Sequence, residues 1–247
     1  MNNFKIILAL DSSSINHLIL RLITPTQEYD FPPIIQHLES TLIPAVDSLL
    51  QQAKLSIQDV DAFIIGKGPG SFMGLRLGFS VFRTWAWLYD TAIISVSSLE
   101  LLRRSTIKQE QDILYVPCID SKMKRVFTNI TSSSSILLED CDIFPEILAQ
   151  EIIDIQTKHN FKKIVLISSG APLVQEFLIN TMVNNIIEIH TDTIIAIQCF
   201  DKFYIKQLDE SCFSKKSTDQ LKSIEPNYCR LSAAEMTLLE KNSLNDR

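Results

Sequence analysis

Glycine is scarce in this chain, and its few residues are not spread evenly. The sequence of 247 residues contains six glycines, and five of them lie within the stretch IGKGPGSFMGLRLG, residues 65–78. Glycine is the residue that tolerates positive φ and close backbone approach. The concentration therefore predicts that one turn of the structure needs such freedom while the rest of the fold does not.

Cysteine and histidine are also few, and their spacing argues against the common metal sites. The five cysteines form no CxxC pair, and an odd number cannot close into intramolecular disulfides alone. No two of the four histidines lie within one helical turn of each other; they are His17, His37, His159 and His190. We therefore expect free thiols in a reducing compartment and no bound metal.

Long apolar runs and excess positive charge are absent as well. No stretch approaches the roughly 20 apolar residues that a membrane span requires, and the beginning MNNFKIILALDSSS lacks the pattern of a secretory signal. The net charge of −6 argues against a protein that grips a nucleic-acid backbone unaided. With 46% hydrophobic residues, the chain is expected to be globular and cytoplasmic, without a membrane partner.

The hydrophobic pattern predicts an α/β fold whose first half holds three strands followed by alternating helices and strands. The expected elements are strands at 4–10, 15–23 and 26–31, a helix at 34–50 with a kink or a broken first half because of Pro44, a strand at 61–65, a helix at 75–89, a strand at 91–96 and a helix at 97–104. The helix at 75–89 is apolar most of the way round, which indicates a central position or a cover from another molecule.

The second half repeats this order of elements. Its expected elements are strands at 113–119, 125–130 and 135–138, a helix at 145–159, a strand at 163–167, a helix from Pro172, a strand at 186–189 and a long helix capped by Thr191 or Asp192. Such a duplication is the organisation of the actin-like and Hsp70-like ATPase superfamily, with two subdomains that each contain a five-stranded mixed sheet. We expect subdomains at 1–106 and 107–210, and a tail at 211–247 that packs back on the first.

The glycine stretch fits none of three standard phosphate or nucleophile motifs. It lacks G-x-x-x-x-G-K-[ST], G-x-G-x-x-G and G-x-S-x-G at the required spacings. The remaining interpretation is a tight strand-to-helix turn of Gly66, Gly68, Pro69 and Gly70, with Ser71 as the N-cap of the next helix. Gly74 and Gly78 would share one face of that helix and permit the close approach of another backbone.

The same stretch carries a specific resemblance. GKGPGSFMGLRLG resembles the signature GxGPGSFTGLRxG of the bacterial TsaB (YeaZ) family, which takes part in making N6-threonylcarbamoyladenosine on tRNA. Five other stretches also agree with the family, so the resemblance spans about residues 5–231. They are ILALDSSS, HLESTLIPAVDSLL, VSSLELL, CIDSKMKRVF and EPNYCRL. Two positions depart from the family pattern: Met73 replaces a threonine, and Ser12 stands where threonine is common.

The resemblance implies a subunit without catalytic residues. In this family the paralogue TsaD transfers the threonylcarbamoyl group, TsaB supports it, and the ATPase TsaE completes the assembly. The chain is therefore expected to bind TsaD, to meet tRNA only through the complex, to hold no cofactor on its own, and to contact ATP or ADP, if any, at the interface of the complex. An isolated homodimer through the same surface is a further expectation.

The surface expected to meet the partner consists of the two apolar helices, which could form a four-helix bundle with an equivalent pair. Its candidate residues are Ile35, His37, Leu38, Leu42, Val46, Gly74, Leu75, Arg76, Gly78, Phe79 and Phe82.

Three residues are candidates to face a nucleotide, namely Asp11, Ser12 and Asp120, because the superfamily places aspartates at the ends of the corresponding strands. Ordinary turn formation is the competing interpretation, and for Asp120 it is the favoured one. A small ATPase or kinase-like protein is the alternative function; a peptidase finds no metal pair or convincing triad in the sequence.

Overall fold

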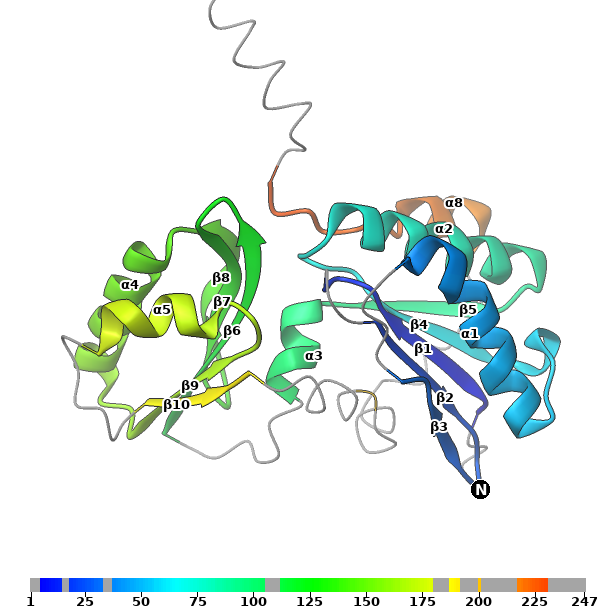
Figure 1. Cartoon of the computed structure of the whole chain (residues 1–247), viewed down its shortest axis with the longest axis horizontal. Coiled ribbons are helices and arrows are strands. Elements are labelled where there is room, and N and C mark those ends of the chain that lie inside the picture. Colours follow the sequence, from blue (N-terminus) through cyan, green and yellow to red (C-terminus); the bar gives the residue numbers. More distant parts are fainter. Residues whose placement is uncertain are drawn as a thin grey trace, which may run out of the picture.

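The chain forms two α/β lobes that lie side by side, with one short helix between them (Figure 1). The computed structural model describes residues 5–14, 18–32, 37–104, 112–179, 187–191, 200 and 217–230. Each lobe is built on one five-stranded mixed sheet.

The sheet of the first lobe has the strand order β3-β2-β1-β4-β5. Its strands are β1 (Ile7–Asp11), β2 (Ile19–Ile23), β3 (Glu28–Asp30), β4 (Ala62–Gly66) and β5 (Ala92–Val96). β1 pairs with β2 in the antiparallel direction and with β4 in the parallel direction, and β5 extends the parallel half. All residues of the central strands β1 and β4 are buried, as expected for strands covered on both faces.

The sheet of the second lobe repeats this topology. Its strands are β6 (Ile113–Lys122), β7 (Arg125–Thr131), β8 (Ile136–Ile143), β9 (Lys163–Ile167) and β10 (Ile187–His190). The order β8-β7-β6-β9-β10 again places three antiparallel strands beside a parallel half. The duplicated mixed sheet confirms the fold class that the order of elements predicts from the sequence.

Alternate residues of the first sheet point into two separate cores. The helices α1 (Leu38–Ala53) and α2 (Phe72–Leu88) cover one face, and a short 3-10 turn, η1 (Ile57–Asp59), precedes β4. The core beneath them joins strand and helix side chains of both kinds, among them Leu10, Leu22, Phe63, Leu49, Phe79 and Phe82. The aromatic rings of Phe63 and Phe82 lie 5.1 Å apart, which suits a tilted aromatic pair.

The opposite face of the first sheet is covered by α3 (Ser98–Arg104), which lies between the lobes in Figure 1. Leu101 belongs to the core on this face, together with Ile7 and Ile64. Its neighbour Leu102 packs against that core and also against the core of Ile113 and Tyr115 on the second sheet. A helix of seven residues thus supplies apolar contacts to both lobes.

In the second lobe, α4 (Pro145–His159) and α5 (Ala171–Leu178) cover the outer face of the sheet. α4 begins and ends at the residues that the sequence predicts, because Pro145 is favoured in the first turn and Asn160 adopts the left-handed conformation after the last one.

Parts of two predicted helices lie outside the described residues. They are the beginning of the helix predicted at 34–50 and the helix predicted to be capped by Thr191 or Asp192. The kink predicted at Pro44 is not accompanied by a break, since α1 runs as one helix from Leu38 to Ala53. Pro44 is exposed, so its ring and the carbonyl group that it leaves without an amide partner face solvent.

The described part of the tail, residues 217–230, contacts the first lobe. Its short helix α8 (Thr218–Ser223) lies beside α2 in Figure 1, and Leu221 is buried in the core beneath α1 and α2. Phe200 differs from its predicted place in the second subdomain, because it is fully buried in the first-lobe core with Leu101. The chain therefore returns to the first lobe before residue 211.

The burial of the α2 aromatic residues leads to a stability prediction. Phe82→Ala should lower the free energy of unfolding by about 3–5 kcal/mol, since it removes a fully buried ring and leaves a cavity. Met73→Ala, on the same helix but 75% exposed, should change it by less than about 0.5 kcal/mol. Urea unfolding of the isolated chain measures both; equal losses would contradict the assignment of Phe82 to the chain's own core.

Candidate functional site

Asp11 at the end of β1 and the two serines that follow it form a buried polar segment. Asp11, Ser12 and Ser13 are each less than 5% exposed. The Asp11 carboxylate accepts hydrogen bonds from the Ser13 amide and hydroxyl groups and from the Ser98 hydroxyl, all at 3.0 Å. Both of its oxygens are therefore engaged within the chain itself.

Burial raises the pKa of Asp11 above its ordinary value, and the three hydrogen bonds from Ser13 and Ser98 oppose that shift. Hydroxyl and amide donors stabilise this carboxylate. Such a group resembles a structural turn former more closely than a free ligand of a nucleotide or metal.

The glycine stretch packs directly on this loop. The Ser71 amide donates to the Ser13 carbonyl oxygen at 2.6 Å, and the Ser12 hydroxyl donates to the Gly74 carbonyl oxygen at 2.9 Å. A Cβ atom at Gly74 would collide with the Ser12 carbonyl oxygen, and one at Gly70 with that of Ser13. The turn therefore needs glycine because two backbones of the same chain approach each other there.

At Gly68, glycine is needed for its backbone conformation. It is the one described glycine with positive φ, at 91°, and it precedes a cis peptide bond to Pro69. Its amide donates to the Ser98 hydroxyl, the same group that reaches Asp11. Ser71 caps α2 as predicted, since its side chain accepts from the Gly74 amide at 3.2 Å.

The small-residue face of α2 therefore needs a correction. Gly74 and Gly78 were expected to let the backbone of a partner approach α2. In the structure, Gly74 faces Ser12, and Gly78 faces Ser12 and Leu10. Gly66 likewise faces the side chain of Asp11. All these contacts are made within the first lobe.

The same correction applies to most of the apolar residues that were expected to face a partner. Each of the following is no more than 3% exposed: Leu42, Val46, Leu75, Phe79 and Phe82. The sheet beneath α1 and α2 covers these side chains, because an amphipathic helix turns its apolar stripe toward the core. Leu38 is half-buried against that core, and Ile35 lies outside the described residues.

Other residues of the two helices do remain exposed. Large apolar side chains are accessible at Ile43 on α1 and at Met73, Trp87 and Leu88 on α2. His37, with φ of 58°, precedes α1, and its ring lies 3.7 Å from the Glu39 carboxylate with both side chains about three-quarters exposed. Arg76 is exposed and places its guanidinium 4.0 Å from the centre of the Phe72 ring.

Asp120 lies near the end of β6, beside the hairpin that leads into β7. Its carboxylate accepts from the Lys122 amide at 2.8 Å and from the Lys122 ammonium group at 3.1 Å. Lys122, Met123 and Lys124 all have positive φ, which closes the tip of the β6–β7 hairpin.

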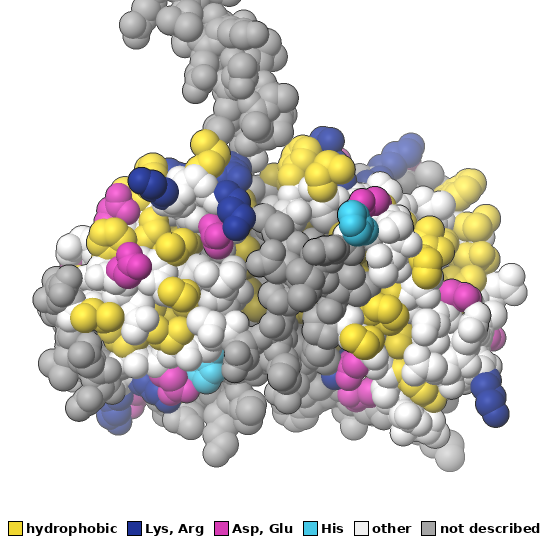
Figure 2. Space-filling model, viewed as in Figure 1, with side chains coloured by type: hydrophobic (Ala, Val, Ile, Leu, Met, Phe, Trp, Pro, Cys, Tyr) yellow, Lys and Arg dark blue, Asp and Glu magenta, His cyan; other side chains and the backbone are white. Residues whose placement is uncertain are grey.

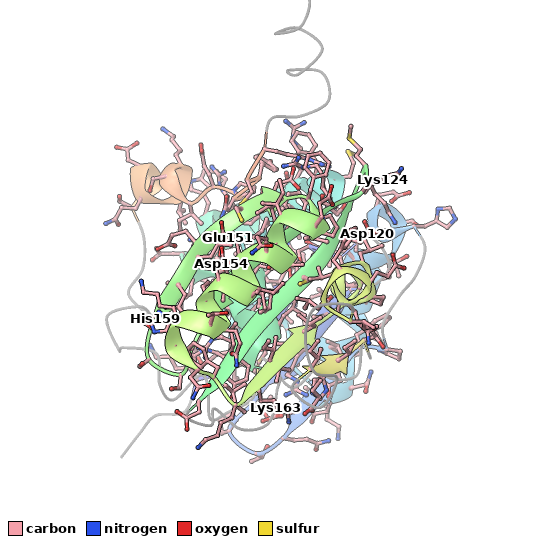
Figure 3. All side chains as sticks on the ribbon, turned by 90° about the vertical axis from the view of Figure 1, so that its left-hand side faces the viewer. Asp120, Lys124, Glu151, Asp154, His159 and Lys163 are labelled. Atoms are coloured by element: carbon pink, nitrogen blue, oxygen red, sulfur yellow. The ribbon has the colours of Figure 1, made fainter. Side chains whose placement is uncertain are left out.

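The six titratable residues that are labelled on the second lobe in Figure 3 do not gather at one point. Figure 3 labels Asp120, Lys124, Glu151, Asp154, His159 and Lys163. Asp120 and Lys124 lie near the hairpin tip, the next three are spread along α4, and Lys163 lies at the far end of the sheet. Within the described ranges, no three His, Cys, Asp or Glu side chains are placed to hold a metal ion.

The segment at residues 226–230, here called the crossing segment, connects the two lobes. The Asn227 amide donates to the Lys67 carbonyl oxygen at 2.6 Å, while its side chain donates to Asp140 of β8 at 3.3 Å. The Tyr228 ring packs on Phe72 of the first lobe at 4.6 Å. Arg230 donates to the Ser121 carbonyl oxygen of the second lobe at 2.9 Å.

Asp140 is the centre of this connection. It accepts hydrogen bonds from Ser97 of the first lobe at 3.1 Å and from Asn129 of the second at 2.8 Å, in addition to Asn227. Burial, with the nearby Asp140 charge, raises the pKa of Cys229 to about 12, so its thiol stays protonated at neutral pH. The crossing segment is part of the motif EPNYCRL, but the sequence alone does not indicate that this motif connects the two lobes.

The comparisons with known proteins agree with this architecture. A family model described as TsaD, tRNA N6-adenosine threonylcarbamoyltransferase, matches residues 32–238. The protein named tRNA threonylcarbamoyladenosine biosynthesis protein TsaB from Bacillus subtilis is 34% identical over 139 residues, which cover 54% of this chain and 58% of that one. The chain belongs to the family that this model describes, and several of its curated relatives are named TsaB.

Other TsaB relatives match over shorter stretches. The TsaB protein of Haemophilus influenzae is 31% identical over 86 residues, which are 36% of its length. The chain thus matches roughly a third to just over half of the length of these curated relatives. A solved structure titled YeaZ from Pseudomonas aeruginosa covers 91% of this chain and all of its own with a TM-score of 0.67; at 18% identity it shows the fold.

None of the helices in the described part of the chain has the length and apolar character that crossing a membrane would take.

The buried Asp11 leads to a prediction about pH. An acid whose pKa is raised on folding binds its proton more tightly in the folded state, so ionisation above about pH 4 removes stability. Asp11→Asn keeps a hydrogen-bonding side chain without the charge, and its free energy of unfolding should fall less than that of the unchanged protein between pH 4 and pH 7.

Urea unfolding across that pH range measures the effect. Asp120→Asn is the matched control, because Asp120 lies beside the hairpin that leads into β7 and not in the buried segment at the end of β1, and it should leave the pH profile unchanged. Asp11→Ala should cost about 1–3 kcal/mol by leaving the Ser13 amide without its acceptor. A steeper profile for Asp11→Asn would contradict the assignment.

Proposed function

We propose that this chain is a non-catalytic subunit of the machinery that makes threonylcarbamoyladenosine on tRNA, and that it acts by binding and supporting TsaD, with TsaE in the larger assembly. Membership of this family and the relatives named TsaB support the pathway. The observation that carries the accessory role is the segment at the end of β1, where Ser13 and Ser98 donate to the Asp11 carboxylate and the glycine turn packs on the backbone of Ser12 and Ser13.

The partner surface that best suits this role is the outer side of α1 and α2. Ile43 is 57% exposed and Met73 is 75% exposed, although both belong to helices whose inner side chains are buried in the core of the first lobe. Met73 stands at the position where the family signature has threonine, so this exposed position has become more apolar. Exposed apolar side chains of this size are typical of protein contact surfaces.

Ile43→Asp and Met73→Asp should each weaken binding to the organism's own TsaD by tenfold or more, because a carboxylate would be buried against an apolar partner surface. Isothermal titration calorimetry with purified TsaD measures the affinity. Charged variants of Leu75 or Phe79 are unsuitable, since both residues are core residues and the variants would unfold.

Ile136→Asp is the matched control, since Ile136 is 59% exposed on β8 of the second lobe. It should bind TsaD like the unchanged protein. TsaD binding that survives both Ile43→Asp and Met73→Asp would contradict the proposed surface. Formation of modified adenosine by TsaD and TsaE without this chain would contradict the proposed function.

The alternative is a small ATP-binding or ATPase protein, which the fold class alone supports. It predicts ATP hydrolysis by the isolated chain at ordinary enzyme rates of about 1–1,000 per second. We expect no turnover above background and no change on Asp120→Asn. Steady hydrolysis that disappears in Asp11→Asn would favour the alternative over the accessory role.

A further inference from the structure

A cavity of about 510 Å³ lies between α2 and the tail, on the side of the first lobe that carries α8. Its floor and walls come from two parts of the chain that are far apart in sequence, α2 and residues 221–228. In Figure 2, basic and hydrophobic side chains lie next to each other at the upper rim of the right-hand lobe, the region of α2 and α8 in Figure 1. We call this cavity the tail groove.

The charge of the tail groove is opposite to that of the whole chain. Arg76, Arg83 and Lys222 line it, and no Asp or Glu is among the described residues of its lining. The net charge of the chain is −6, so three cations around one cavity are a local concentration. The Asp219 carboxylate lies 3.3 Å from the Lys222 ammonium group, but its side chain is 94% exposed and is not among those that line the groove.

Aromatic rings line the groove together with these cations. Trp87 is 62% exposed, and Tyr228 is half-buried and packs on Phe72. The hydroxyl groups of Ser80 and Thr84 line the α2 side. A groove that combines cations with an exposed ring can bind single-stranded nucleic acid, with a base on the ring and phosphates on the cations.

The spacing of the cations selects among anionic ligands. Arg76 and Arg83 are seven residues apart on α2, so they are separated by about 10 Å along the helix axis. That distance exceeds the span of the phosphates in one nucleotide and requires a ligand with anionic groups at intervals. An acidic peptide could meet the cations, but it would not use the exposed face of Trp87.

We propose that the tail groove binds a short single-stranded stretch of RNA, with Arg76, Arg83 and Lys222 on phosphates and a base stacked on Trp87. The proposal rests on the proposed function, because it gives this chain a direct contact with the RNA that the complex modifies. The contact is secondary, since the acidic chain as a whole repels a polyanion.

The test measures binding of a fluorescein-labelled twelve-residue oligouridine to the isolated full chain by anisotropy, at several salt concentrations. Three phosphate contacts should give a slope of about −2 in the plot of log affinity against log salt. Arg83→Gln should weaken binding and reduce that slope by about 0.7. Trp87→Ala should weaken it about five- to a hundredfold. Lys158→Gln, an exposed cation on α4, is the matched control and should bind like the unchanged protein.

Three results would overturn the proposal. One is the absence of RNA binding at low salt. Another is displacement of the RNA by uridine monophosphate or pyrophosphate at equal concentration, which indicates a mononucleotide site. The third is equal binding of poly-glutamate with no effect of Trp87→Ala, which indicates an acidic peptide. Calorimetry of Arg83→Gln with TsaD separates this outcome from the proposed function, because this variant should retain TsaD affinity.

Discussion

The contact between the loop after β1 and the glycine turn determines how the first lobe is assembled. The Gly74 backbone and the Ser12 carbonyl group approach so closely that no side chain fits between them. This approach sets the position of the α2 N-terminus over the sheet, and with it the position of every exposed residue on that helix. The Ser98 hydroxyl ties α3 to the same point through Asp11 and Gly68. One small polar cluster thus orients α2 and α3, which lie on opposite faces of the sheet.

This arrangement is compatible with the accessory role that we propose. A fold of this class provides two lobes and a loop at the end of the first strand, but its function depends on what occupies that loop. Here the chain's own hydrogen bonds occupy Asp11. The distinctive chemistry instead lies on the outside of the first lobe, at the exposed apolar residues of α1 and α2 and at the cations and rings beside α8.

The sequence predicts the fold better than it predicts the site, for physical reasons. Strong periodicity and helix caps located α4 to the residue, and the repeated order of elements gave the duplicated sheets. The partner surface was assigned to Leu75 and Phe79 because periodicity identifies an apolar stripe but not what covers it. The contacts of Asn227 with Lys67 and Asp140 depend on chain segments more than 80 residues apart, which no local pattern encodes.

The crossing segment comes after both lobes in the order of the chain. During synthesis, each sheet can therefore be completed before Asn227 and Arg230 emerge. Until then the lobes are joined by the apolar contacts of α3, including those of Leu102. The polar contacts of the crossing segment are thus added last, to lobes that α3 already connects.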